Sequence, residues 1–600
     1  MNNTKIPNRS EVEPRNTWDL STLFASDDAW SAALEVLEQL GGKIPAFKGS
    51  LGKSAESLAD FLDFYRDLGI LEERLGTYAQ LRTTEDEGDG KARTMLGKFM
   101  MADTGIQAAL SWATPEIQAV PDADMGVYLS HGRLRDYRIY LERLLRLKSH
   151  ILSEKEERIL ALHAEGDNLA QEAFSVLTNV DMSFGNIDTA QGPLPLTKST
   201  WAVFMENPNR AVRKKAYESF YEHFAALKTS LGALYGGSVK KDVINARIRG
   251  YSSARAAALF PDNVPETVYD NLVSTIGANL EPLHRYYGLR KKVLRLDTLR
   301  HYDAYVPLVG DISRKTSWNE AVGLVSLALA PLGDEYVNTL RAGLLDRWAD
   351  RYENQGKRAG AFSAGTFTGD PYILMNYQED SIGDVFTLAH EGGHSMHSWY
   401  SVRANPFIHY SYSIFEAEVA STFNEELLFR QMMKTAGSDE DLKTWLINRR
   451  ADTILSTLYR QTMFAEFEQR SHELEEGGTP LTADLLRSEY RKLLEKYFGP
   501  GMVFEKNSDL EGLRIPHFYN AFYVYKYSTG ISASLALAER VLSGGKAERE
   551  DYYRFLMSGG SRFPIDSLKL AGVDMSSPAP VEAACKIFGR LVDELEKRLD

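Results

Sequence analysis

The sequence predicts a mostly helical protein with a small β-hairpin, and three observations support this. Apolar residues recur at helical spacing in one run after another from about Ala29 to Val180, and again from Leu442 to Glu475. The breaks between runs are short, as at Gly41-Gly42. A β signal of any weight occurs only in residues 360–377. Because 44% of the 600 residues are hydrophobic, we expect a multi-helix fold with a large core.

Charge and cysteine content limit the possible functions and compartments. The net charge of −14 argues against a nucleic-acid partner, which would require a basic face. Cys585 is the single cysteine, so no intrachain disulfide can form and a reducing compartment is expected. Residues 1–20 contain no apolar core of the kind that a secretory signal needs, and the apolar run Ala321 to Ala330 is too short to span a membrane. We therefore expect a cytoplasmic protein with no membrane partner.

A change in composition marks the expected domain boundary. Glycine and proline punctuate a short extended piece from Phe184 to Pro195. The chain before it is helical and carries no recognisable chemistry, although Ser153 and Glu156 form the capping-box pattern that begins a helix. We expect an N-terminal helical domain over residues 1–183 and a catalytic domain over residues 184–600.

The β signal consists of two short runs, Gly360 to Phe367 and Tyr372 to Tyr377, joined by a Thr-Gly-Asp-Pro turn. This pattern predicts a hairpin. Lying beside a functional site, its strand edge could bind an extended peptide through main-chain hydrogen bonds, reading backbone rather than side chains. The alternative is a hairpin with a purely structural role.

Directly after the hairpin, residues 384–400 contain the pattern H-E-x-x-H at His390, Glu391 and His394. On a helix the two histidines lie one turn apart on the same face and can converge on one zinc ion, while Glu391 can act as general base on a zinc-activated water. The alternative is a surface helix with two solvated histidines. That alternative is disfavoured because the helix is apolar nearly all round, and a buried carboxylate needs a charge partner such as a metal.

Catalytic zinc usually has three protein ligands, so a third ligand is needed. The helical run 413–429 carries four glutamates, of which Glu418 has the most apolar neighbours and is the best candidate. Glu416 and Glu426 are expected to face water. Glu425, two turns beyond Glu418, and Asp384 are both candidates to accept a hydrogen bond from a ligand imidazole. Two other histidines of this region, His397 and His409, are weaker candidates for ligands by helical geometry.

Further along, residues 514–530 are dense in aromatic residues and contain His517, Tyr519, Tyr523 and Tyr525. Tyrosines at this density could simply form the buried stripe of an amphipathic helix.

The segments NYQEDSIGDVFTLAHEGGHSMHSWYS and IFEAEVASTFNEELL closely resemble the oligoendopeptidase F family, within the thimet oligopeptidase-like zinc metallopeptidases. The resemblance covers most of the chain and is strongest from about Gly360 to Gly530. It implies a nearly all-helical fold with a deep internal channel, one wall of which is the N-terminal part. Gly392 departs from the family pattern, in which a bulky apolar residue is expected.

The resemblance also implies the roles of individual residues. His390, His394 and Glu418 would be the ligands of one zinc ion and Glu391 the catalytic base. A histidine and a tyrosine in the segment 514–530 would face the scissile carbonyl; we choose His517 and Tyr525, with Tyr519 and Tyr523 as alternatives.

We therefore expect a zinc endopeptidase that cleaves short unstructured oligopeptides. Two alternatives remain. The first is a related helical exopeptidase of the metallocarboxypeptidase type, which would need a basic site for a terminal carboxylate, and the sequence has no motif for one. The second is a helical scaffold protein without catalytic activity, in which the H-E-x-x-H pattern is fortuitous. Zinc content and peptidase activity distinguish the scaffold from the enzyme.

Overall fold

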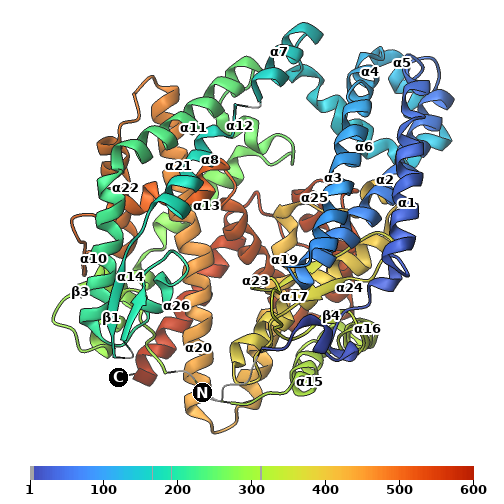
Figure 1. Cartoon of the computed structure of the whole chain (residues 1–600). Helices are drawn as coiled ribbons and strands as arrows, with labels where there is room; N and C mark the ends of the chain where they lie inside the picture. The colour runs from blue at the N-terminus through green and yellow to red at the C-terminus, as the bar shows by residue number, and fades with distance from the viewer. Residues whose placement is uncertain (1–5, 165, 191, 311, 313, 600) are drawn as a thin grey trace. The chain divides into compact units, whose positions relative to one another are not determined.

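The computed structural model describes residues 6–164, 166–190, 192–310, 312 and 314–599 (Figure 1). Residues 1–5 of the N-terminal stretch and residue 191 of the extended piece lie outside the described residues. Helices dominate and the sheets are small, which confirms the predicted fold class. Of the helices described, none has the length and apolar character needed to cross a membrane.

The chain forms two compact units, each built from three segments. Unit 1 comprises Met1–Ser149, Ser313–Thr435 and Leu537–Val573, and unit 2 comprises His150–Ile312, Ala436–Ala536 and Asp574–Asp600. Residues 183 and 184, where the sequence predicts a domain boundary, both lie in unit 2. That boundary stays a prediction.

Unit 1 contains helices from all three of its segments. They are α1 (Asp27–Gly41), α2 (Ala55–Glu85), α3 (Gly90–Leu110), α4 (Ala113–Ala119), α5 (Asp122–Tyr128), α6 (Arg138–Arg146), α15 (Trp318–Ala328), α16 (Asp334–Leu345), α17 (Ile382–Ala404), α18 (Phe407–Tyr410), α19 (Ile414–Thr435), α24 (Lys546–Leu556) and α25 (Pro564–Leu570). The apolar run from Ala321 is part of α15, a helix with a largely buried face, as the sequence predicts.

Unit 2 is also helical, with two small strand pairs. Its helices are α7 (Glu154–Ala164), α8 (Leu169–Val176), α9 (Trp201–Met205), α10 (Arg210–Ala226), α11 (Lys228–Ile248), α12 (Ala254–Leu259), α13 (Glu266–Ala278), α14 (Glu281–Val293), α20 (Glu440–Ile454), α21 (Arg460–Glu476), α22 (Ala483–Phe498) and α26 (Ala579–Leu599). Its strands are β1 (Asn186–Thr189) with β2 (Gly192–Pro195), antiparallel, and β3 (Leu299–Arg300) with β7 (Met502–Val503), parallel. Helix α23 (Tyr525–Ser543) begins in unit 2 and ends in unit 1.

Several helices begin just after a residue whose side chain accepts hydrogen bonds from the first backbone amides of the helix. Ser54 accepts a hydrogen bond from the backbone of Ser57 at the start of α2, and Asp89 accepts from two backbone amides at the start of α3. At the start of α7, Glu156 accepts from the backbone and hydroxyl of Ser153, as the capping-box pattern predicts. A π-helical turn, Leu455–Tyr459, separates α20 from α21 within the run of helical spacing from Leu442 to Glu475, and the sequence pattern does not show this break.

The hairpin predicted from residues 360–377 is present and belongs to a three-stranded sheet. Strand β5 (Phe362–Ala364) pairs antiparallel with β6 (Tyr372–Leu374), and β4 (Ala349–Asp350) pairs parallel with β6 on its other side. The order β4-β6-β5 leaves β5 at the edge. Strand β4 was not predicted, because two residues are too few to give a periodic signal.

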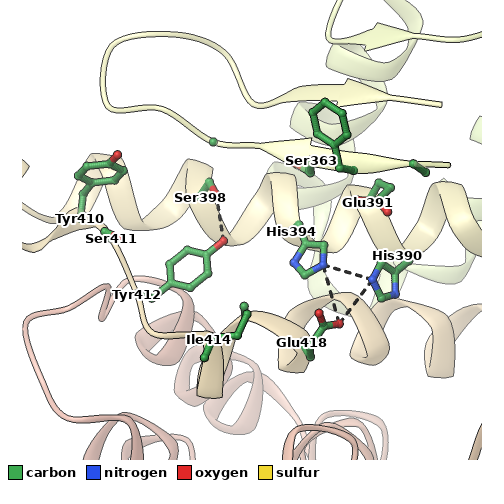
Figure 2. Close-up of a pocket in the computed structure, with 14 residues that line it drawn as sticks. Ser363, His390, Glu391, His394, Ser398, Tyr410, Ser411, Tyr412, Ile414 and Glu418 are labelled. Carbon is green, nitrogen blue, oxygen red and sulfur yellow. Dashed lines mark hydrogen bonds and ion pairs between the residues drawn. The ribbon is translucent and has the colours of Figure 1, made fainter. Parts of the chain in front are cut away.

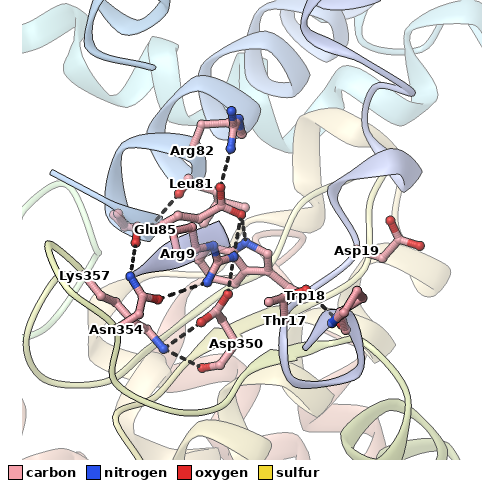
Figure 3. A network of polar contacts seen from close by, with 12 residues as sticks. Arg9, Thr17, Trp18, Asp19, Leu81, Arg82, Glu85, Asp350, Asn354 and Lys357 are labelled. Carbon is pink, nitrogen blue, oxygen red and sulfur yellow. Dashed lines mark hydrogen bonds and ion pairs between the residues drawn. The ribbon is translucent and has the colours of Figure 1, made fainter. Parts of the chain in front are cut away.

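The N-terminal segment is tied to this sheet by a buried polar network (Figure 3). Arg9 contacts Glu85 at the end of α2 (2.9 Å) and Asp350 of β4 (2.5 Å), while the indole of Trp18 donates to Glu85 (2.7 Å). Lys357, whose side chain is fully buried, contacts Asp350 (2.6 Å) and donates to three backbone carbonyls. Burial lowers the pKa of Lys357, an effect that Asp350 opposes. The network therefore fixes the sheet that carries β5.

Candidate metal centre and active site

Helix α17 carries both histidines of the H-E-x-x-H pattern. His390 and His394 lie one turn apart, and their ring centroids are 4.9 Å from each other. Asp384 accepts hydrogen bonds from the backbone of Gln378 (2.8 Å) and the hydroxyl of Ser381 (2.9 Å). Asp384, one of the two residues that the sequence offers to support a ligand imidazole, therefore stabilises the start of α17 and does not contact an imidazole through these bonds.

Gly393 of the motif allows α17 and α19 to pack closely, side by side in yellow in Figure 1. A Cβ atom on Gly393 would lie 2.5 Å from the carbonyl oxygen of Ala420 and 2.6 Å from the Cα of Ser421, so a larger residue cannot fit. A Cβ on Gly392 would meet only the side chain of Leu340, at 3.2 Å. Asn424 of α19 also donates to the carbonyl of Ala389 on α17 (3.2 Å). This close crossing brings α19 within reach of both histidines.

Glu418 of α19 completes a cluster with His390 and His394 (Figure 2). The two Nε2 atoms are 3.2 Å apart, and a carboxylate oxygen of Glu418 lies 3.6 Å from Nε2 of His390 and 4.0 Å from Nε2 of His394. Ligands held tetrahedrally at about 2.0–2.1 Å from one zinc ion are separated by roughly 3.3 Å. The spacing of these donor atoms therefore fits zinc.

Glu425 orients the first histidine. Its carboxylate lies 2.6 Å from Nδ1 of His390, so Nδ1 donates to Glu425 and Nε2 is the ring nitrogen that faces Glu418. Burial lowers the pKa of His390, but the hydrogen bond and charge of Glu425 outweigh it and raise that pKa to about 9. Burial, together with the neighbouring His390, lowers the pKa of His394 to about 3. The pair holds one positive charge between two carboxylates, a charge that a metal cation can replace.

Glu391 lies on the strand side of α17 (Figure 2) and is 6% exposed. Among the described residues its Oε2 has no hydrogen-bond partner. Burial raises the pKa of Glu391 to about 7; His390 opposes this shift, and the charges of Glu418 and Glu425 add to it. Glu391 lines a cavity and has a buried oxygen without a partner and a pKa near neutrality, which are properties of a general base.

These residues line a cavity of about 470 Å³ that lies wholly in unit 1. The edge strand contributes Phe362, Ser363 and, just beyond its end, Gly365. The hydroxyls of Ser363 and Ser395 share a hydrogen bond of 2.9 Å, which joins β5 to α17 one residue after His394. The site thus combines a metal-ligand cluster, a candidate base and an unpaired strand edge.

Two glutamates of α19 differ from the sequence-based expectation. Glu416 and Glu426, expected to face water, are each 2% exposed, whereas Glu418, expected in the apolar interior, is half-buried in the cavity wall. Glu416 bonds to Ser413 (3.0 Å) and Glu426 to Arg430 (2.7 Å). The cavity, which no sequence pattern shows, decides which glutamate is accessible.

Neither of the weaker histidine candidates belongs to the cluster. His397 is buried and stacks on Tyr412, with ring centroids 3.6 Å apart, and His409 is buried on α18. Tyr412 lines the cavity and shares a hydrogen bond of 3.0 Å with Ser398. Its part in the site was missed from sequence, because the segment before α19 gives no periodic signal.

The aromatic segment, residues 514–530, belongs to unit 2, whereas the metal-ligand cluster belongs to unit 1. His517 is exposed, and its ring is 6.2 Å from that of Tyr523. Tyr525, the first residue of α23, is fully buried with its ring 5.2 Å from Tyr269, and burial raises its pKa well above the usual value. Tyr519 is 6% exposed and stacks on Phe174.

Comparison with known proteins identifies the family of the chain. A model of peptidase family M3 matches residues 203–587, and a model described as oligopeptidase F matches residues 116–184. Oligopeptidase PepF of Bacillus subtilis is 42% identical over 99% of this chain and 89% of the relative. A crystal structure from Chlamydophila abortus is 35% identical, covers 99% of this chain and 100% of that one, and has a TM-score of 0.92.

A second crystal structure, oligoendopeptidase-F from Enterococcus faecium, is 30% identical, covers 96% of this chain and 99% of that one, and has a TM-score of 0.76. The family model spans well over half of the chain and includes both α17 and α19. The chain therefore belongs to peptidase family M3, together with the oligoendopeptidase F proteins, and is a metalloendopeptidase.

Proposed function

We propose that the protein hydrolyses internal peptide bonds of short unstructured oligopeptides, with one zinc ion held by His390, His394 and Glu418. The observation that carries this proposal is the near-tetrahedral spacing of the three donor atoms beside the buried Glu391. Oligopeptides as the substrate class are supported by the name of the Bacillus subtilis relative, oligopeptidase PepF. An edge strand beside the cluster also suits an extended chain. A folded protein does not offer such a chain.

Zinc at this site would supply Lewis acidity to polarise the scissile carbonyl and acidify water. Glu391 takes the proton of the attacking water at its carboxylate and then delivers it to the nitrogen of the leaving amine as the C–N bond breaks. The free edge of β5 holds the peptide backbone extended past Glu391. Glu425 keeps the proton on Nδ1 of His390, so that Nε2 remains a ligand.

His517 and Tyr525 are proposed to donate hydrogen bonds to the oxyanion that develops on the carbonyl oxygen. The resemblance to the family supports this assignment. Because Tyr523 is half-buried beside His517 whereas Tyr525 is fully buried, Tyr523 is the alternative donor. The deep internal channel that the resemblance implies stays a prediction.

The domain division and the compartment are also proposals. An N-terminal helical domain over residues 1–183 and a catalytic domain over 184–600 are supported by the two family models, of which one ends at residue 184 and the other starts at 203. A cytoplasmic location is supported by the single buried cysteine, Cys585, which suits a reducing compartment.

A mixed digest tests the proposal. The purified protein is incubated with a pool of synthetic peptides and one stably folded protein, and mass spectrometry locates every cut. We expect internal cuts in peptides, an intact folded protein, and about one zinc per chain by elemental analysis. Cuts confined to peptide ends would identify an exopeptidase. Zinc far below one per chain, with no activity after zinc addition, would identify a scaffold.

A further inference from the structure

A second cavity, of about 550 Å³, adjoins the catalytic one within unit 1. Both cavities are lined by Tyr410 and Ser411, which lie in Figure 2 at the end of the catalytic pocket remote from His390. The second cavity is otherwise lined by Tyr65, Leu68, Gly69, Glu72, Glu73, Gly76, Thr77, Phe99, Asp103, Phe407 and Ile408, from α2, α3 and α18. The two cavities thus share part of one wall.

Two glycines of α2 let aromatic rings form the walls of this cavity. A Cβ on Gly69 would lie 2.8 Å from the ring of Phe407, and one on Gly76 would lie 2.7 Å from the ring of Phe99. Both rings therefore lie directly against the helix backbone. The close contact of these two rings with α2 thus shapes the cavity wall.

The charge of the lining is negative. Three carboxyl groups line the cavity, from Glu72, Glu73 and Asp103, and no lysine, arginine or histidine is among its described lining residues. Glu73 has structural partners: it accepts hydrogen bonds from the backbone of Phe367 (2.7 Å) and from the hydroxyl of Tyr410. Glu72 and Asp103 lie close together, and the side-chain amide of Gln107 donates to both carboxyl groups, at 3.3 and 3.5 Å. This donor is neutral, so it does not balance their charge.

The Glu72 and Asp103 pair holds a proton where a cation could bind. Burial, followed by the hydrogen bond and charge of Asp103, raises the pKa of Glu72 to about 8. At neutral pH the carboxyl group of Glu72 therefore holds a proton, next to Asp103. An ammonium or guanidinium group between them could replace that proton and pair with both carboxylates.

The edge strand leads from the reacting centre to this cavity. Ser363 and Gly365 line the catalytic pocket, and Phe367, two residues later, bonds to Glu73 in the wall of the second cavity. A peptide extended along β5 rises about 3.3 Å per residue. A group about two or three residues from the scissile bond would therefore reach the second cavity.

We propose that this cavity is a subsite for a positively charged group of the peptide substrate, with Glu72 and Asp103 as specificity-determining residues. The group is the α-ammonium of the peptide or the side chain of a lysine or arginine about two or three residues from the scissile bond. This inference rests on the proposed function, since it concerns the same substrate in the same pocket.

The test compares kcat/KM for peptides of one sequence in three forms. The first has a free amino terminus, the second is acetylated and carries no cation, and the third is acetylated with one lysine placed at successive positions. We expect the first form, or the third at one or two positions, to exceed the second by about tenfold, the size of one charge-assisted hydrogen bond. The peptide form whose kcat/KM exceeds that of the neutral form identifies the source of the cation.

In the double variant Glu72→Gln/Asp103→Asn, the ratio of kcat/KM for the cationic peptide to kcat/KM for the neutral peptide should fall close to one. The value of kcat/KM for the neutral peptide should stay within about twofold of that of the wild-type protein, because that peptide makes no ionic contact there. Glu72→Gln alone should keep most of the preference, because Asp103 retains the charge. The control is Asp67→Asn, which removes an exposed carboxylate from the same helix and should change nothing.

An unchanged preference in the double variant, or no preference in the wild-type protein, would overturn the proposal. The wild-type comparison needs no substitution, so it decides the matter even if the double variant does not fold. Failure of the proposed function has a different signature: the wild-type protein would then leave the neutral peptide uncut as well.

Discussion

A single carboxylate, Glu425, sets the chemistry of His390. It is placed two turns beyond Glu418 on α19, so one helix supplies both a candidate ligand and the group that orients another. We expect Glu425→Gln to weaken zinc binding about 10- to 100-fold and to leave kcat nearly unchanged at saturating zinc, because the amide keeps the contact but loses the charge. Zinc affinity is measured by competition with a chelator.

Asp384→Asn is the matched control for Glu425, because Asp384 was the other candidate from sequence and bonds only at the start of α17. Its zinc affinity should equal that of the wild-type protein. If Asp384→Asn weakens zinc binding and Glu425→Gln does not, the two roles must be exchanged.

Substitution of a zinc ligand removes the metal, whereas substitution of the general base removes turnover. This difference tests the assignments of Glu418 and Glu391. Glu418→Ala should lose zinc, as should alanine at either histidine. Glu391→Gln should keep zinc and lose at least about 10²-fold in kcat, because proton transfer is lost while the donor cluster is intact. Elemental analysis and steady-state kinetics on the same samples give both values. Normal zinc and activity in Glu418→Ala would send the search to Glu416 and Glu425.

The tyrosine assignment is tested by paired variants. If Tyr525 donates to the oxyanion, Tyr525→Phe should keep its zinc and KM and lose about 10²- to 10³-fold in kcat, because the hydrogen bond strengthens only as charge develops. Tyr523→Phe, its half-buried neighbour beside His517, should then be nearly fully active. The reverse pattern, with early unfolding of Tyr525→Phe, would make Tyr523 the donor and Tyr525 a core residue.

The sequence predicted residues whose spacing is local and missed those whose role depends on packing. His390 and His394 follow from one helical turn. Glu418 was chosen for its apolar neighbours, yet it belongs to the cluster as a half-buried residue of the cavity wall. Glu416 was wrongly expected in water, since its buried surroundings include Ser567 of α25, about 150 residues away along the chain. No helical periodicity identifies such a partner, because it reports one face of one helix.

At the scale of elements, the three-stranded sheet depends on the buried ion contacts behind β4. Lys357→Met should lower the free energy of unfolding by about 3–5 kcal/mol, because it leaves Asp350 buried with one fewer cation and three carbonyls without their donor. Denaturant unfolding followed by circular dichroism measures this loss.

The control for Lys357 is Lys315→Met, which removes an 81% exposed lysine paired with Glu379 in the same unit. Such exposed pairs contribute at most about 1 kcal/mol. Equal stabilities of the two variants would show that the buried contacts of Lys357 add nothing to the fold.

Elements with a strong local signal were predicted well. The hairpin, the two helices of the metal cluster and the core helix at Ala321 follow from turn residues and periodicity. The π-helical turn between α20 and α21 could not be predicted, since it changes the hydrogen bonding of the backbone while apolar spacing continues.

At the scale of the whole molecule, a buried histidine of unit 2 predicts sensitivity to acid. Burial lowers the pKa of His301 to about 3, and Tyr217 contacts its Nδ1 at 2.8 Å. In the unfolded chain the group titrates near 6.5, so below that pH the unfolded state binds the extra proton. The free energy of unfolding should fall as pH drops from 6.5, by up to about 1.4 kcal/mol per pH unit from this group.

His301→Phe removes that titration and should make stability less steep between pH 6.5 and 4.5, whatever the variant's stability at pH 7. Urea unfolding at several pH values measures the slope, and comparison of the two slopes cancels contributions that both proteins share. Equal slopes would mean that His301 does not carry the acid sensitivity.

The division into two units, each assembled from three stretches of chain, was beyond sequence reasoning. Patterns of glycine and proline mark where regular structure stops, but they carry no information about which distant stretches pack together. Composition and periodicity therefore predict the class of fold but not the division of the chain into two units.

The core of unit 1 has a consequence for synthesis on the ribosome. Its apolar cluster combines residues between Trp18 and Leu141 with Tyr372 and Leu374 of β6, which are made about 230 residues after Leu141. At translation rates of about 5–20 residues per second, the early helices wait roughly 10–50 s for their partners. For that time they expose an apolar surface that the finished protein buries. The nascent chain is thus a natural client for a chaperone that acts before translation ends.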